Sequence, residues 1–135
     1  MNGRREWSED MRLITVLGAI LFSGVLAFAH HSFDAEYDSK KPITVTGYVT
    51  KLDWLNPHAY VYIDVRDDGG EVKNYKIEMG PPYALTRGGW KRDTVKIGDK
   101  ITVNNAALAK DGRNAAGSMP ATSMTLADGH KLVMR

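Results

Sequence analysis

The sequence predicts an all-β domain after a short polar arm, and three observations support this. Apolar and polar residues alternate in short segments, most clearly between His58 and Val65. Asn-Pro and Asp-Gly turn signals separate these segments. Only the stretch from Pro81 to Gly88 has the proline start and glycine end of a helix. Alternation with a period of two is expected of half-buried strands, so we expect strands joined by turns and one short helix.

The first strand is expected from Ile43 to Trp54, a segment rich in β-branched residues. Gly47 lies inside it, where glycine usually marks a bulge or a sharp bend. The apolar phase also slips between Val49 and Leu52, as a bulge would make it do. Further strands are expected at 58–65, 72–79, 100–109 and from about 122, with an irregular loop at 115–120 and a last short strand at 130–134.

Three strands, a short helix and two further strands form the element order of the OB fold, a five-stranded Greek-key barrel. The predicted fold class is therefore a small five-stranded OB-like Greek-key barrel with one short helix between strands 3 and 4. An open β-sandwich or roll with the same elements is the alternative.

The N-terminus has the features of a secretory signal. Arg4, Arg5 and Arg12 precede an uncharged apolar stretch from Leu13 to Phe28, and Ala27-Phe28-Ala29 forms an A-x-A cleavage signature. The apolar stretch is short for a spanning helix, which needs roughly 20 residues. We therefore expect export to the periplasm or the outside of the cell, with no integral membrane segment after cleavage. An uncleaved N-terminal anchor is the alternative.

Three segments are predicted: a signal peptide at 1–29, an N-terminal arm at 30–41 and a single OB-like domain at 42–135. Acidic residues before Met11 are unusual in a signal, so Met11 is a candidate for the true start. The formal net charge of +2 and the lack of a basic run argue against nucleic acid as a partner. The chain contains no cysteine, so the core must hold the fold without disulfides.

Histidine provides the clearest candidate for chemistry. Cleavage after Ala29 would leave His30 with a free α-amino group, and this amine can chelate a metal ion together with the ring. A second imidazole, from His31 or His58, would complete a three-nitrogen clamp, which suits Cu(II). The arrangement resembles the histidine brace of lytic polysaccharide monooxygenases and of CopC-type copper carriers. We therefore expect a metal carrier or buffer with copper as the candidate cofactor, while a histidine pair that serves only as a polar spacer is the alternative.

The segment around Trp54-Leu55-Asn56-Pro57-His58 is a second candidate site. The loop between strands 1 and 2 is a usual ligand-binding edge of OB folds. Trp54, Tyr60 and Tyr62 could form a stacking wall beside Asn56, Pro57 and His58 for a sugar, a peptide or an envelope protein. The structural alternative is that Asn56-Pro57 only fixes the turn and Trp54 fills the end of the barrel.

An enzymatic role has less support, and we predict no catalytic residue. The chain has no cysteine nucleophile, G-x-S-x-G elbow, P-loop or H-E-x-x-H motif. A hydrolase or isomerase would have to use His58 as the base, with Asp53 or Asp64 to orient it. His130 follows a tight turn and is expected on the surface.

Several motifs together resemble one known family. They are the mature start His30-His31-Ser32-Phe33, the motif W-x-N-P-H-A at Trp54 to Ala59, Gly89-Trp90, and the closing segment from Leu126 to Leu132. This pattern resembles DUF6152, a family of small exported bacterial proteins of unknown function. The resemblance implies a signal peptide and a small β domain, and it implies no activity.

Overall fold

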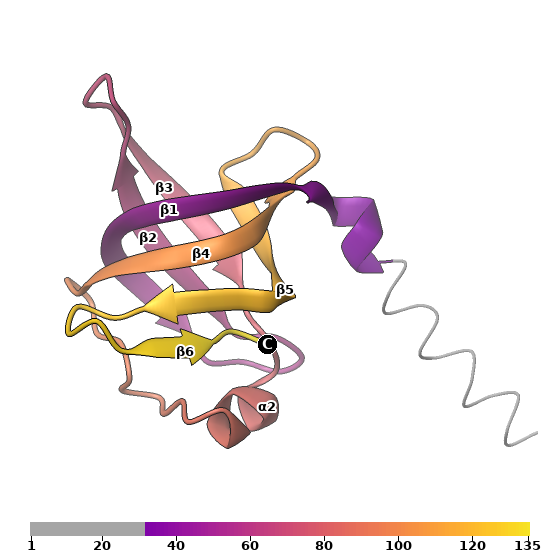
Figure 1. The fold of residues 1–135 in the computed structure, drawn as a ribbon, viewed down its shortest axis with the longest axis vertical. Helices are drawn as coiled ribbons and strands as arrows, with labels where there is room; N and C mark the ends of the chain where they lie inside the picture. The colour runs from indigo at the N-terminus through magenta and orange to yellow at the C-terminus, as the bar shows by residue number, and fades with distance from the viewer. Residues whose placement is uncertain (1–31) are drawn as a thin grey trace, which may run out of the picture. The chain divides into compact units, whose positions relative to one another are not determined.

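The computed structural model describes residues 32–135 (Figure 1). The whole sheet belongs to one compact unit, Glu36–Arg135. Residues 32–36 are helical. The elements that follow are β1 (Tyr37–Asp53), β2 (Tyr60–Arg66), β3 (Val72–Glu78), α2 (Pro82–Arg87), β4 (Lys100–Ala109), β5 (Ala115–Thr125) and β6 (Lys131–Val133). The predicted all-β class is confirmed, and so is the short helix between the third and fourth strands.

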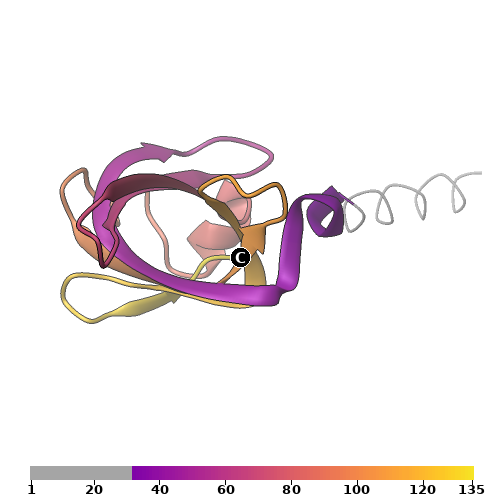
Figure 2. The ribbon, with the colours of Figure 1, turned by 90° about the horizontal axis from the view of Figure 1, so that it is seen from above.

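The sheet has six strands in the order β3-β2-β1-β4-β5-β6, with antiparallel neighbours. A further parallel pairing joins β3 to β5, with Ile77 opposite Ala116. Among these strands, β1 pairs with β2, β2 with β3, β3 with β5, β5 with β4, and β4 with β1. The series of pairings therefore ends on the strand at which it began. Figure 2 shows these strands curving around a shared interior.

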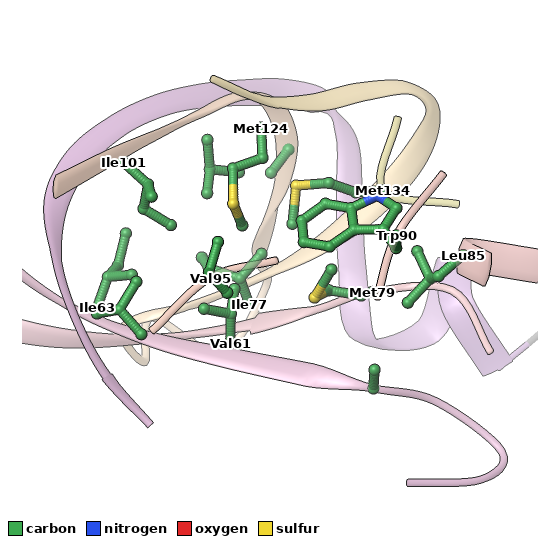
Figure 3. Packing of buried hydrophobic residues seen from close by; sticks show 14 of the residues in the cluster. Val61, Ile63, Ile77, Met79, Leu85, Trp90, Val95, Ile101, Met124 and Met134 are labelled. Atoms are coloured by element: carbon green, nitrogen blue, oxygen red, sulfur yellow. The ribbon is translucent and has the colours of Figure 1, made fainter. Parts of the chain in front are cut away.

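The interior is filled by alternate residues of the strands. Val61 of β2 lies beside its paired residue Ile77 of β3, and Ile63 of β2 and Ile101 of β4 belong to the same buried cluster (Figure 3). Burial of an aliphatic side chain of this size stabilises a fold by about 1.5–3 kcal/mol. Trp90, which follows α2, is only 1% exposed. It therefore belongs to the core and covers it after the helix.

The first strand begins earlier than the sequence predicted, at Tyr37 and not at Ile43. Residues 37–41 were assigned to the arm because they are polar, but Tyr37 pairs with Ala109 of β4 and is 4% exposed. The predicted bulge is confirmed, because the pairing of β1 with β2 shifts between Val49 and Lys51.

The predicted irregular loop at 115–120 is wrong, because β5 starts at Ala115. Residues 115–118 are small because this part of β5 lies between β3 and β4. Ala116 pairs with Leu108 of β4 on one side and with Ile77 of β3 on the other. Ala115 and Ala116 are almost fully buried, so their lack of bulk permits the close approach of three strands.

Candidate functional site at His58

The loop between β1 and β2 places His58 beside the end of β3. Trp54 opens the loop and is partly buried against the core, as expected for a residue that fills one end of it. Asn56 and Pro57 are exposed and joined by a cis peptide bond. The backbone of the next residue, Ala59, then exchanges hydrogen bonds with the chain just after β3: its N–H donates to the carbonyl of Gly80, and its carbonyl accepts from the N–H of Met79. These bonds fix the position of His58 relative to β3.

The partner of His58 is Glu78, the last residue of β3. Nδ1 of His58 lies 2.7 Å from Oε1 of Glu78. The hydroxyl of Tyr37 donates to the other carboxylate oxygen at 2.9 Å, and the hydroxyl of Ser118 donates to the backbone carbonyl of Glu78 at 2.6 Å. The Glu78 side chain is 14% exposed and that of His58 is 44% exposed. The carboxylate is thus fixed on two sides, while the ring that it holds reaches solvent.

This contact determines which ring nitrogen is available for chemistry. A carboxylate oxygen only accepts hydrogen bonds when ionised, so Nδ1 must carry the proton and Nε2 keeps its lone pair in a neutral ring. Within residues 32–135, Nε2 of His58 has no hydrogen-bond partner. Metal-binding histidines commonly donate the second ring N–H to a carboxylate in this way. The geometry therefore suits a ligand nitrogen or a proton acceptor at Nε2.

The acids considered from the sequence as partners of His58 are engaged elsewhere. Asp53 accepts from the ammonium group of Lys51 at 2.9 Å, and Asp64 accepts from the amide of Asn74 at 2.8 Å. Glu78 takes the role instead. It was missed because an acid at the end of an alternating strand has the pattern of an ordinary surface residue.

Tyr60 and Tyr62 lie on the outer face of β2, but cations cover their rings. The Lys76 ammonium is 4.1 Å from the centroid of the Tyr60 ring, and that of Lys51 is 5.0 Å from the Tyr62 ring. These are cation–π distances, at which each ammonium is attracted to the ring face. A flat ligand would have to displace a lysine in order to stack there, so the expected stacking wall is less accessible than the alternation suggests.

Two of the predicted metal ligands, His30 and His31, lie outside the described residues. In the part of the chain that the structure describes, no three His, Cys, Asp or Glu side chains gather closely enough to hold a metal ion. His130 is exposed just after a turn, as predicted, and its backbone N–H donates to the Asp128 carboxylate. No helix within residues 32–135 is long and apolar enough to cross a bilayer.

A family model described as "Family of unknown function (DUF6152)" matches residues 19–118. The chain belongs to this family. The resemblance drawn from HHSF and W-x-N-P-H-A is therefore confirmed, and His58 and Glu78 both lie in the matched range. Comparison of this DUF6152 member with curated proteins and with solved structures gave no match. The family description carries no activity, so function has to be argued from the site.

The bond between Tyr37 and Glu78 predicts a loss of stability in alkali. Burial of the ring, followed by the negative charge of Glu78, raises the pKa of Tyr37 above its ordinary value of 10.0. The unfolded chain then releases this proton at a lower pH than the folded chain does. The stabilisation is complete below about pH 9 and declines as the pH rises through 10. Urea unfolding should show this decline, and it should be shallower in Tyr37→Phe; equal slopes in the two proteins would contradict the assignment.

Proposed function

We propose that this protein is an exported periplasmic metal-binding protein that carries or buffers copper. In this proposal the signal is removed after Ala29, and His30 becomes the first residue of the mature chain. The α-amine and the ring of His30 then supply two ligands, and a second histidine ring supplies the third. Three nitrogen ligands in a flat arrangement are suited to Cu(II).

The observation that carries the proposal is the contact between His58 and Glu78. The contact holds the ring through Nδ1, while the side chain as a whole stays 44% exposed. A ring that is already oriented loses less conformational entropy when it binds a metal ion than a free side chain does. This favours His58 over His31 as the second ring. It also gives Glu78 the role of positioning residue, which acts on the metal through His58 and does not touch it.

We also propose that the sheet is a small OB-like Greek-key barrel. The supporting observation is the sequence of pairings, which runs from β1 through β2, β3, β5 and β4 back to β1. In OB folds the loop between the first two strands is a ligand-binding edge. His58 lies in that loop, so the proposed site has the place that this fold commonly uses.

A binding module that stacks sugars or peptides on Trp54, Tyr60 and Tyr62 is the second reading of the same edge. Lysines over two of the three rings weigh against it. A copper-binding measurement distinguishes the metal site from the binding module, because only the metal site requires a free α-amine at His30.

The test is a titration with Cu(II), followed by electron paramagnetic resonance, on protein that begins at His30. We expect tight binding and a nitrogen-rich spectrum. The matched control is the same protein with one additional methionine before His30, which removes the chelating amine; we expect its affinity to fall at least roughly 100-fold, because a ligand is lost. Equal weak binding by both forms would reject the clamp.

Three variants then test the role of the second ring. His58→Ala should lower the copper affinity and remove one nitrogen from the spectrum, whereas His130→Ala, at an exposed turn, should change neither. Glu78→Gln should weaken binding by roughly 10-fold while the ligand set stays the same, as is usual for outer-shell partners. An unchanged spectrum in His58→Ala would transfer the role to His31 and remove Glu78 from the mechanism.

A further inference from the structure

A groove lies on the outer face of the sheet, at the opposite end of β2 from His58. Its volume is about 500 Å³, within the range of small-ligand sites. Gly47 forms part of it, and six side chains line the remainder: Thr46, Tyr48, Asp64, Arg66, Val72 and Lys100. They come from β1, β2, β3 and β4, so the groove is built on paired strands and not on loops.

At Gly47, which lies in the groove, β1 passes closely over β2. A Cβ atom at this position would lie 2.3 Å from the backbone oxygen of Asp64, closer than side-chain atoms approach a carbonyl. Only glycine therefore permits this approach, and the bend of β1 is visible in Figure 1.

The charges in the groove favour an anionic ligand. Lys100 has no ion pair within residues 32–135. Arg66 donates from Nη1 to the Gly70 carbonyl at 2.7 Å, which fixes the guanidinium without neutralising it. The only acid in the lining, Asp64, already accepts a hydrogen bond from Asn74. Two cations thus face one carboxylate that is partly satisfied.

Tyr48 adds an open aromatic surface. Its side chain is 55% exposed. Unlike Tyr60 and Tyr62, it has no cation over its ring among the described residues. Val72, which is 46% exposed, extends the apolar surface. A ligand that fits both features needs a flat apolar face as well as negative charge.

The pairing of β1 excludes one common kind of ligand. At Tyr48 the strand is paired on both edges, with Asp64 of β2 and with Lys100 of β4. A peptide therefore cannot bind here by adding a strand to the sheet. Recognition has to use side chains on the face of the sheet.

We propose that this groove binds an acidic saccharide, a chain that contains uronic acid units. The apolar face of a sugar ring would lie on Tyr48, and its carboxylate would meet Lys100 and Arg66. Sugar hydroxyls would bond to the Asp64 carboxylate oxygen that does not accept from Asn74, and to the hydroxyl of Thr46, which also shares a hydrogen bond with Thr102. This function goes beyond copper binding at His58 and does not depend on it.

The test is a titration of protein purified after export from a bacterial host, with oligogalacturonate as the probe, followed by calorimetry and by amide NMR shifts. We expect binding, with the largest shifts near Tyr48. Three comparison ligands separate the features of the probe: the methyl-esterified oligomer has no charge, oligoglutamate has charge without rings, and phosphate is a simple anion. Binding of any of the three as tightly as oligogalacturonate would overturn the proposal.

Matched variants locate the site. Tyr48→Ala and Lys100→Ala should each weaken binding by roughly 10-fold, the usual size of a lost charge-assisted or aromatic contact. Tyr83→Ala and Lys131→Ala remove an exposed tyrosine and an exposed lysine elsewhere and should leave binding unchanged. Thermal unfolding checks that all four variants fold. Binding that persists in both groove variants, or shifts confined to other strands, would place the ligand elsewhere and reject the inference.

Discussion

Replacing Trp90 with alanine is expected to lower the free energy of unfolding by about 3–5 kcal/mol, the largest effect of any core substitution in this domain. Trp90 is the largest fully buried side chain within residues 32–135, and it lies beside Met79 and Met134 in the core (Figure 3). Its indole N–H also donates to the Val133 carbonyl at 2.7 Å, which holds β6. The substitution would leave a cavity and an unpaired carbonyl. Urea denaturation followed by circular dichroism would measure the loss.

Two further variants separate the contributions of Trp90. Trp90→Phe keeps most of the apolar volume and removes the hydrogen bond, so it should cost less, about 1–3 kcal/mol. Tyr83→Ala removes an aromatic side chain that is 65% exposed, and it should change stability by no more than about 0.5 kcal/mol. A Trp90→Ala protein as stable as Tyr83→Ala would show that this residue does not anchor the core.

Gly47→Ala is expected to destabilise the domain by roughly 3 kcal/mol or more. The added methyl group would meet the backbone oxygen of Asp64 at 2.3 Å and its carbonyl carbon at 2.9 Å. Backbone atoms cannot rotate away as a flexible side chain can, so β1 and β2 would have to separate. Relief of the clash would break the pairing between Tyr48 and Asp64. A thermal unfolding midpoint should show the loss.

Gly69→Ala is the matched control for Gly47→Ala. Gly69 lies in the turn between β2 and β3, and a Cβ there would meet only the Asp67 side chain, at 3.3 Å. The Asp67 carboxylate can adjust by a small rotation, so a change within about 0.5 kcal/mol is expected. If both alanine variants unfold at the same temperature, β1 does not approach β2 closely at Gly47.

The parts of the fold that sequence predicted best are those with one buried face. Val61 and Ile63 alternate with polar residues, and this period of two identifies β2 directly. β4 was located to the residue, at Lys100 to Ala109, because a glycine turn precedes it and an Asp-Gly turn follows it. These signals are local, so a single sequence contains them in full.

The missed parts depend on contacts distant in sequence. The first half of β5 has small residues instead of alternation, because Ala116 packs between β3 and β4. In the sequence, Tyr37 stands among polar residues and has the pattern of an arm. Its place in the sheet depends on β4 and on Glu78, which are distant in the sequence. The first strand and the fifth were therefore both predicted too short.

The same reasoning explains the site. The motif around Asn56, Pro57 and His58 was found because turn residues followed by histidine are unusual in a sequence. Its orienting group, Glu78, comes from another strand, and only the pairing of Tyr60 with Glu78 brings that carboxylate to the loop. The sequence therefore identified His58 as a candidate, whereas the pairing of β2 with β3 was needed to identify Glu78 as the residue that orients its ring.

The parallel pairing of β3 with β5 has a consequence for how the polypeptide is made. It joins Ile77, in the middle of the chain, to Ala116, near its end. While the chain is being synthesised, β3 has only β2 beside it until most of the remaining residues have emerged. Contacts so distant in sequence form slowly, because a long loop must close before they give any stabilisation. In the export that we propose, late closure would leave the chain unfolded enough to pass through a translocation pore, and the final packing would form on the far side of the membrane.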